Sequence, residues 1–185
     1  MRSSSFQTMF INRNHVKAYV SIGSNMGDRA GSLLLAIRGM TEAAMCVTRL
    51  SSVYETAPVS EIEQQPFLNM VVEVGNTLPT PEQMMARLLR IEYVLGRTRE
   101  TKDGPRTIDL DLLLYGDTEK HTEFLRLPHP RLHERRFVLE PLVEIAPHCL
   151  HPTLKCTAAQ LLQKLEDKSA VKMWSPKQAL TAFLA

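Results

Sequence analysis

Two aspartates, Asp109 and Asp111, stand one residue apart in an otherwise apolar run, residues 108–115 (IDLDLLLY). The run predicts a β-strand, and because side chains alternate between the two faces of a strand, both carboxylates should lie on one face. The alternation predicts Thr107, Leu113 and Tyr115 on the face of the acids and Ile108, Leu110, Leu112 and Leu114 on the other. Two carboxylates about 7 Å apart at their Cα atoms repel each other unless a cation lies between them. Two Mg²⁺ ions bridged by the acids would remove this repulsion and hold a phosphate chain, whereas the alternative is a solvated face whose acids pair with arginines.

Basic side chains crowd the sequence on both sides of the two acids. They are Arg97, Arg99, Lys102 and Arg106 upstream, and His129, Arg131, Arg135 and Arg136 downstream. Guanidinium groups bind phosphate oxygens through paired hydrogen bonds. Acids for a metal and arginines for a polyphosphate together predict a nucleoside triphosphate site. Neither a G-x-x-x-x-G-K-[ST] nor a G-x-G-x-x-G motif is present, so side chains must hold the phosphates.

Periodicity and capping signals predict the elements that position these residues. A strand is expected at 17–22, and the turn residues Gly23-Ser24-Asn25 end it. Ser32 is expected to cap a helix whose apolar stripe is Leu33, Ile37, Met40 and Ala44. Strands are expected at 46–56 and 67–77, paired antiparallel because no helix separates them. Thr80, Pro81 and Gln83 begin a second helix that ends at Gly96, with a buried stripe of Met84, Leu88, Ile91 and Leu95.

The order strand, helix, strand, strand, helix, strand is typical of the ferredoxin-like, split βαβ arrangement. The predicted class is therefore α+β, with a mainly antiparallel sheet, helices on one face, and mobile loops. The last predicted strand is followed by a Pro- and Arg-rich loop at 127–136 and an apolar segment at 137–145. Thr157 and Gln160 form a capping box that predicts an extra C-terminal helix.

Length and charge limit the classes of function. The chain has 185 residues and a formal net charge of +2, which predicts one domain and no bulk attraction to nucleic acid or membranes. Three scattered cysteines and the lack of a long apolar run favour a cytoplasmic protein with reduced thiols. Residues 1–17 contain three basic residues and no acid, so they weakly resemble an organellar presequence, but a disordered or loosely docked extension is the preferred interpretation.

Five short motifs occur in an order and spacing that resemble a known family. They are Gly23-Ser24-Asn25-Met26-Gly27-Asp28-Arg29, Tyr54-Glu55-Thr56, Phe67-Leu68-Asn69, residues 104–111 (GPRTIDLD) and residues 127–131 (LPHPR). The family is 6-hydroxymethyl-7,8-dihydropterin pyrophosphokinase of folate biosynthesis, and the resemblance covers roughly Lys17 to Leu165. It implies transfer of the pyrophosphoryl group of ATP to the hydroxymethyl group of a reduced pterin, with release of AMP.

The resemblance also implies roles for individual residues. It assigns catalysis to Arg97, Arg106, Asp109, Asp111 and His129, with two Mg²⁺ ions bound by Asp109 and Asp111. It assigns the nucleotide to Glu92, Arg97, Arg106, Leu112, His129 and Arg135, and the pterin to Thr56, Val59, Phe67, Asn69 and Phe137. Without the resemblance, Glu92 is better interpreted as a helix-end acid paired with Arg97. Family members often have a proline at the position of Ala57 and an aromatic residue near Asp103, so closure of the loop over the pterin is expected to differ here.

The expected organisation is an N-terminal extension (1–16), a pyrophosphokinase domain (17–174) and a C-terminal tail (175–185), acting as a monomer on ATP and a reduced pterin. One alternative is a nucleotidyltransferase, although Gly23-Ser24 and Asp109 are separated by two predicted strands and two helices. Another is an RNA-binding module, although the acids of the last strand would repel a phosphate backbone. One cluster of possible zinc ligands also occurs, and it consists of His148, Cys149, His151 and Cys156. Its spacing fits no closed zinc template, so we interpret it as a structural turn.

Overall fold

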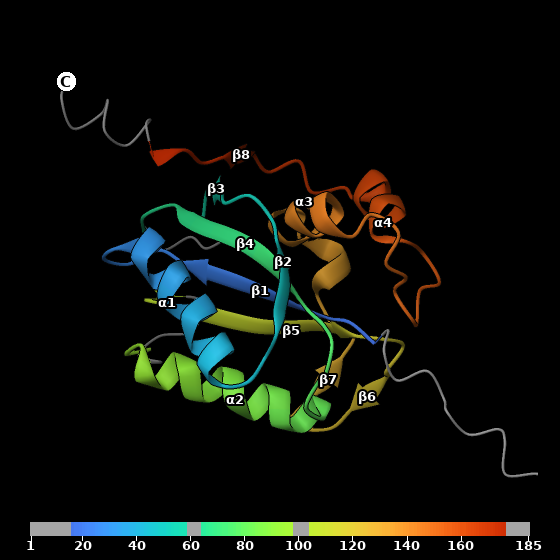
Figure 1. Ribbon diagram of the computed structural model, residues 1–185. Coiled ribbons are helices and arrows are strands. Elements are labelled where there is room, and N and C mark those ends of the chain that lie inside the picture. The colour runs from blue at the N-terminus through green and yellow to red at the C-terminus, as the bar shows by residue number, and fades with distance from the viewer. Residues whose placement is uncertain (1–15, 59–63, 98–103, 177–185) are drawn as a thin grey trace, which may run out of the picture.

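An antiparallel sheet forms the centre of the computed structural model, which describes residues 16–58, 64–97 and 104–176 (Figure 1). Its strands are β1 (Ala18–Ser24), β2 (Val47–Leu50), β3 (Tyr54–Thr56), β4 (Phe67–Val74), β5 (Asp109–Tyr115) and β8 (Val171–Met173). They are ordered β5-β1-β4-β3-β8, and β2 also pairs with β4. A separate hairpin is formed by β6 (Lys120–His121) and β7 (Arg126–Leu127). The order of β5, β1, β4 and β2/β3 is that of a ferredoxin-like sheet, so the predicted fold class is confirmed.

Helices cover both faces of this sheet. Figure 1 shows α1 (Arg29–Glu42) and α2 (Pro81–Val94) on one side, and α3 (Arg136–Ile145) and α4 (Ala158–Lys164) on the other. A 3₁₀ turn, Leu132–Glu134, precedes α3. The two helices of the predicted core, α1 and α2, lie on one face as expected, and the second face is covered by helices that the core pattern did not place. The apolar segment 137–145 is helix α3, and its buried residues Val138, Leu139, Leu142 and Ile145 recur at helical spacing against the second face.

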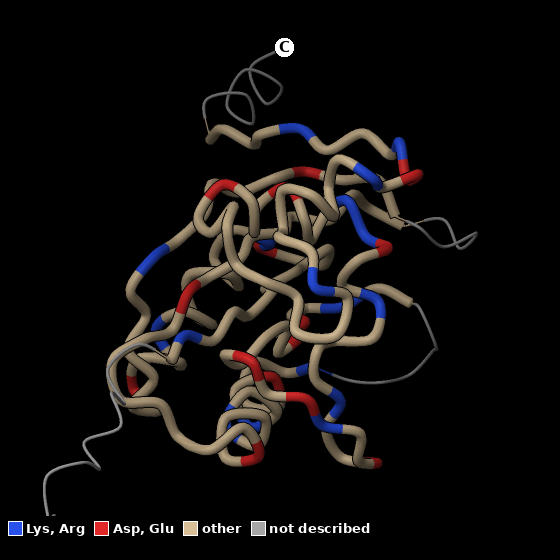
Figure 2. The backbone as a smooth tube through the Cα atoms, turned by 90° about the vertical axis from the view of Figure 1, so that its right-hand side faces the viewer, with Lys and Arg blue, Asp and Glu red and all other residues tan. Residues whose placement is uncertain are grey.

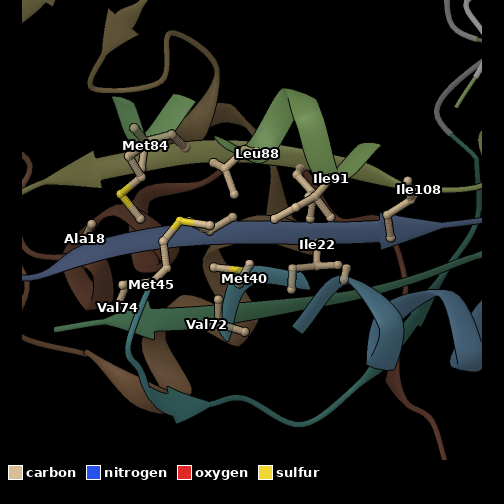
Figure 3. Close-up of a cluster of buried hydrophobic side chains, with 14 of the residues drawn as sticks. Ala18, Ile22, Met40, Met45, Val72, Val74, Met84, Leu88, Ile91 and Ile108 are labelled. Carbon is tan, nitrogen blue, oxygen red and sulfur yellow. The ribbon is translucent and has the colours of Figure 1, made fainter. Parts of the chain in front are cut away.

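The core between the sheet and helices α1 and α2 is continuous and rich in methionine. Figure 3 shows Ala18 and Ile22 of β1 and Val72 and Val74 of β4 close to side chains from both helices. The helices contribute Leu33, Met40, Met84, Leu88 and Ile91, as the apolar stripes predict. Ala44 lies beyond the end of α1 and is exposed, so it does not belong to the stripe.

Two predicted boundaries differ from the structure. Helix α1 begins earlier than expected, because Asp28 caps it by accepting a hydrogen bond from the Gly31 N–H at 2.9 Å, so Ser32 lies inside the helix. The strand expected at 46–56 is divided at Ser51, whose N–H donates to the Val71 carbonyl at 2.9 Å. Both capping boxes, at Thr80 and Thr157, are confirmed.

A β-bulge at Leu113 interrupts the alternation along β5. The pairing with β1 passes from Leu112 to Leu114, which leaves Leu113 as the extra residue. As a result Leu114 packs beside Leu113 on the α3 side, and Tyr115 packs toward α1 and α2, the reverse of the predicted alternation. Asp109 and Asp111 precede the bulge and keep the predicted common face.

Helices α3 and α4 cover only one end of the second sheet face. Tyr19, Val71 and Leu113 are buried beneath them, whereas the end with Gly23, Asn69 and Asp109 opens into a cavity. In the view of Figure 2, basic and acidic residues are interspersed along the backbone. In the described part of the chain, no helix is long and apolar enough to cross a membrane.

Candidate active site

The cavity at the open end of the sheet has a volume of about 690 Å³. Four neighbouring strands supply its floor: Thr56 from β3, Phe67 and Asn69 from β4, Ser21 and Gly23 from β1, and Asp109 and Asp111 from β5. Strand register brings them together, because Gly23 lies opposite Asn69 on one side and opposite Asp109 on the other. The wide separation of Gly23 and Asp109 in the sequence is therefore no argument against a shared site.

Arginines hold both oxygens of Asp109. Arg97 Nη1 lies 2.7 Å from Oδ1 and Arg106 Nη1 lies 2.6 Å from Oδ2. Arg97 also donates to Glu92, which places its guanidinium between two carboxylates. The basic cluster predicted upstream of the acids thus converges on Asp109, at least through these two members. Arg99, Lys102 and Asp103 lie outside the described residues.

Asp111 is held much less tightly than Asp109. Its Oδ2 lies 3.7 Å from His129 Nε2 and 3.6 Å from Arg135 Nη1, which is longer than a hydrogen bond. Burial in the cavity wall and the neighbouring Asp109 raise the pKa of Asp111, and Arg135 opposes this only in part. A further cation would therefore be stabilised at Asp111.

The two acids suit a cation that binds together with phosphate. Mg²⁺ is commonly held by one or two carboxylates and completes its shell with water and substrate phosphates. In the described residues, no group of three or more His, Cys, Asp or Glu side chains is placed to hold a metal by itself. The donor set thus fits Mg²⁺ brought in with a polyphosphate, and it does not fit a closed structural metal site.

Glu92 lies behind the cavity wall and is almost fully buried. Its Oε1 accepts from the Leu110 N–H at 2.7 Å, so it joins helix α2 to strand β5, and it also pairs with Arg97. Burial raises the pKa of this carboxyl, with the Leu110 N–H and Arg97 acting in the opposite direction. The geometry matches the helix-end pair with Arg97, and Glu92 does not line the cavity.

The bulge at Leu113 helps to position His129. The Leu113 carbonyl accepts from the His129 N–H at 2.9 Å, and His129 Nδ1 accepts from the Arg131 N–H at 3.2 Å. Burial, followed by the charges of Arg135 and Arg131, lowers the pKa of His129 to about 4. At neutral pH the ring is therefore uncharged, and its Nε2 carries the proton that faces Asp111. A second cavity of about 490 Å³ lies against His129 and is also lined by Arg126 and His133.

An amide and two aromatic rings occupy the other side of the main cavity. Asn69 is buried and its Nδ2 donates to Thr56 Oγ1 at 2.7 Å, which leaves its carbonyl oxygen facing Gly23. A Cβ atom at Gly23 would lie only 2.8 Å from that oxygen, so glycine is required for the amide to keep its position. Phe67 and Phe137 both line the cavity, and the Arg135 guanidinium lies 5.4 Å from the centre of the Phe137 ring.

Asn25 joins three segments around the cavity and is 2% exposed. Its Oδ1 accepts from the Arg106 N–H at 2.7 Å, and its own N–H donates to the Arg106 carbonyl at 3.1 Å. Its Nδ2 donates to Gln64 Oε1 at 2.8 Å and to the Gln65 carbonyl at 3.2 Å. This side chain ties the turn after β1 to the segments before β4 and β5.

Most of the predicted site residues meet at this cavity. Thr56, Phe67, Asn69, Arg106, Asp109, Asp111, Arg135 and Phe137 line it, and Arg97 and His129 reach it through the two acids. Leu112 does not, because its side chain is buried on the opposite face of β5 under α1 and α2. Val59 lies outside the described residues. Asn25, Asp167 and Ser169 were not predicted: Asn25 occurs in the first motif, but no local signal marks the other two.

The segment that contains His148, Cys149, His151 and Cys156 forms a closed turn, as predicted. The His151 N–H donates to the Cys156 carbonyl at 2.8 Å, and Leu150 and Thr157 form a β-bridge. Burial lowers the pKa of His151, whose ring lies edge-on to His133 at 6.0 Å.

Comparison with known proteins agrees with this geometry. Residues 19–147 match the family model described as 7,8-dihydro-6-hydroxymethylpterin-pyrophosphokinase (HPPK). The chain is 42% identical over 168 residues to 2-amino-4-hydroxy-6-hydroxymethyldihydropteridine pyrophosphokinase of Bacillus subtilis, covering 90% of this chain and 95% of that protein. It is 39% identical to the mitochondrial folate synthesis bifunctional protein of Arabidopsis thaliana, over 77% of this chain and 26% of that protein.

Solved structures support the same fold. Wild-type HPPK-DHPS of Plasmodium falciparum with pteroate superposes with a TM-score of 0.64 at 16% identity, over 83% of this chain and 45% of that chain. At this identity the likeness concerns the fold alone. Together with the family match and the bacterial relative, the cavity described above establishes that the chain belongs to the 7,8-dihydro-6-hydroxymethylpterin-pyrophosphokinase family.

Proposed function

We propose how this site performs the reaction of its family. The chain transfers the pyrophosphoryl group of ATP to the hydroxymethyl group of 6-hydroxymethyl-7,8-dihydropterin in folate biosynthesis. The observation that carries the proposal is the single 690 Å³ cavity, which brings two carboxylates and their arginines to one side and an amide with two aromatic rings to the other. Such a cavity can hold a polyphosphate and a flat heterocycle next to each other.

The pterin would bind between Phe67 and Phe137. A flat heteroaromatic ring is stabilised by two aromatic faces and by an amide that both donates and accepts hydrogen bonds. Asn69 and Thr56, already bonded to each other, would meet the edge of the ring. Val59 is assigned to the same substrate by family resemblance.

ATP would bind along the side of the two acids. Arg97, Arg106 and Arg135 would bind its phosphates, and His129 would donate a hydrogen bond through Nε2 as a neutral ring. The second cavity against His129 offers room for the nucleoside. Glu92 and Leu112 would act from behind, Glu92 by orienting Arg97 and Leu112 by supporting β5 from the core.

Asp109 and Asp111 would bind two Mg²⁺ ions that arrive with ATP. When bound, these ions neutralise the charge of the phosphate chain. The bound ions would then compete with Arg97 and Arg106 for Asp109, and the phosphates would attract both guanidinium groups. This exchange of partners is supported by the position of Asp109, which lines the cavity and is held by both arginines.

The chemical step is a displacement at the β-phosphorus. The pterin hydroxymethyl oxygen forms the new bond to this phosphorus and loses its proton to solvent, the bond to the oxygen that bridges the α- and β-phosphates breaks, and AMP leaves with that oxygen. Reactions of this type require mainly positioning and charge stabilisation, so we assign no general base. Arg97, Arg106 and His129 would stabilise the negative charge that develops toward AMP.

We also propose that the chain acts in the cytoplasm as a monomer without nucleic acid, with residues 17–174 as the catalytic unit. None of its three cysteines forms a disulfide in the described residues, which fits a reducing compartment. Size-exclusion chromatography with light scattering would test the oligomeric state.

The deciding experiment incubates the purified chain with ATP, Mg²⁺ and the hydroxymethyl dihydropterin and separates the nucleotides by chromatography. AMP that forms only with the pterin supports the proposal. Release of pyrophosphate would indicate a nucleotidyltransferase instead, and ADP or no turnover would contradict the proposed reaction.

A further inference from the structure

The chain that follows α4 returns to the active-site cavity, although it lies outside the family match to residues 19–147. Strand β8 pairs with β3, and Val171 lies opposite Thr56. The Trp174 N–H donates to the Val53 carbonyl at 2.8 Å, and its side chain packs against the main core. The segment just before β8 is therefore anchored, and Asp167 and Ser169 become part of the cavity wall.

Helix α3 begins without a cap of its own. The residue at its N-cap position, Arg135, makes no side-chain capping hydrogen bond, and no acid lies in the first turn. The first N–H groups of a helix need acceptors and attract negative charge. Here the acceptor comes from a distant part of the chain, because Asp167 Oδ2 accepts from the Arg136 N–H at 3.1 Å.

Further contacts fix the Asp167 carboxylate in this place. Its Oδ1 accepts from the Ser169 N–H at 2.8 Å, and Arg136 Nη1 donates to the Asp167 carbonyl at 3.3 Å. Arg136 is in turn held by Glu140 through Nε and Nη2, at 3.0 and 2.9 Å. Burial alone would raise the pKa of Asp167, but the N–H groups of Ser169 and Arg136 outweigh it, and the pKa is lowered.

The capped turn carries two residues of the proposed site. Phe137 is the second residue of α3, and Arg135 comes directly before the helix. Arg135 lies over the Phe137 ring and 3.6 Å from Asp111. A shift of this turn would move the aromatic wall and a phosphate-side arginine together.

We propose that Asp167 is a positioning residue for pyrophosphoryl transfer, which caps α3 from the C-terminal segment and thereby fixes Phe137 against the pterin and Arg135 against the acids. This inference rests on the proposed function for its substrates, but the cap itself can be tested without them. Asp167 acts through α3, and no contact of its own with a substrate is required.

The test compares Asp167→Ala and Asp167→Asn with Glu166→Ala, a matched control that removes the neighbouring, exposed carboxylate. In the absence of substrates, Asp167→Ala should speed amide hydrogen exchange at Arg136 about tenfold, the scale expected for a lost helix cap. The KM for the pterin should rise by about tenfold through Phe137, and the KM for ATP should rise through Arg135, while kcat changes by less than about threefold, because Asp109, Arg97 and Arg106 keep their places. Asp167→Asn keeps an acceptor oxygen and should restore these quantities to within about threefold of wild type.

Equal behaviour of Asp167→Ala and Glu166→Ala would overturn the inference. If the alanine variant does not fold, Asp167→Asn decides: slow Arg136 exchange with a near-normal KM supports the cap, and a raised KM with unchanged exchange contradicts it. A wild-type chain that forms no AMP would reject the proposed function, whereas the exchange measurement would still report on the cap. The two failures are therefore distinguishable.

Discussion

Acidic residues at the two ends of one sheet face differ in their hydrogen-bond donors and in the direction of their pKa shifts. At the covered end, Glu73 of β4 is 2% exposed and accepts from Lys17 Nζ at 2.9 Å, Thr48 Oγ1 at 2.8 Å and Tyr19 OH at 3.2 Å. Burial would raise its pKa, but these donors outweigh burial and lower it. At the open end, the partners of Asp111 among the described residues are the distant His129 and Arg135, and its pKa is raised.

This difference separates an acid that stabilises the fold from one that is kept for a ligand. A carboxylate with a full set of donors contributes to stability, whereas one that is desolvated and short of donors costs stability until a cation arrives. Perturbed acids of the second kind gather at functional sites. The following predictions test whether the two ends of the sheet follow this division.

The largest effect is expected from Asp111→Asn. Activity with Mg²⁺ should fall about a thousandfold, the upper scale for loss of one preorganised charge stabiliser. The free energy of unfolding should stay equal or rise slightly, because the amide carries no charge to desolvate. Single-turnover kinetics and urea denaturation measure the two quantities, and near-normal activity would reject the metal-binding role. Asp109→Asn should lose similar activity without any gain in stability, since it removes the charged partner that Arg97 and Arg106 share.

Arg106→Ala should lower kcat by about a hundredfold with a much smaller change in ATP affinity, because its charge is needed most as AMP departs. Arg106→Lys should recover only part of the lost kcat, since an ammonium group cannot form the paired hydrogen bonds of a guanidinium group. Arg38→Ala is the control, because it removes an exposed arginine that pairs with Glu42 in the next helical turn. Single-turnover kinetics and equilibrium ATP titration would separate the effects, and a pure loss of ATP affinity would make Arg106 a binding residue.

Asn69→Ala should weaken pterin binding about tenfold and leave ATP binding almost unchanged, because truncation leaves polar groups of the heterocycle unpaired. Gly23→Ala should act in the same direction, since its Cβ would displace the Asn69 amide oxygen. Calorimetry with each ligand measures both affinities. Equal losses for the two ligands would indicate a general folding defect in place of a pterin contact.

Glu73→Gln should have the smallest effect on activity, with kcat within about twofold of wild type, but it should lower the free energy of unfolding by about 1–3 kcal/mol at neutral pH. Because the folded-state pKa lies below the unfolded one, the contribution of Glu73 is complete above the ordinary glutamate pKa and is lost as the pH falls through the folded value. The difference between wild type and variant should therefore shrink as the pH is lowered below the ordinary glutamate pKa and through the lower folded-state pKa. A difference that persists at acid pH would show that charge at Glu73 is not the cause.

The sequence predicted the part of the site that depends on local pattern. Alternation placed Asp109 and Asp111 on one face, and capping boxes located α2 and α4. The bulge at Leu113 could not be predicted, because it depends on the register with β1, and it reversed the positions of Leu114 and Tyr115. Family resemblance supplied the pterin residues, which no periodic pattern marks.

Contacts between distant segments account for the remaining differences. Asp167 caps a helix that begins 31 residues earlier in the chain, and Asn25 meets Arg106 across 81 residues. Neither contact can be predicted from the spacing or the composition of the sequence. Family resemblance assigned Leu112 to the nucleotide by its position in the motif alone. The alternation of side chains along β5, which holds up to the bulge at Leu113, instead places Leu112 in the core.

The Glu92 carboxylate has one more consequence, for how the protein behaves at high concentration. Strand β5 lies at the end of the sheet order, and an unpaired strand edge invites pairing with another chain. Glu92 accepts the outward Leu110 N–H, and the His129 N–H meets the outward Leu113 carbonyl. A foreign strand would have to displace the buried Glu92 carboxylate and the His129 N–H before it could add to this edge. Glu92 and His129 thus occupy hydrogen-bonding groups at this edge that a second chain would need for pairing.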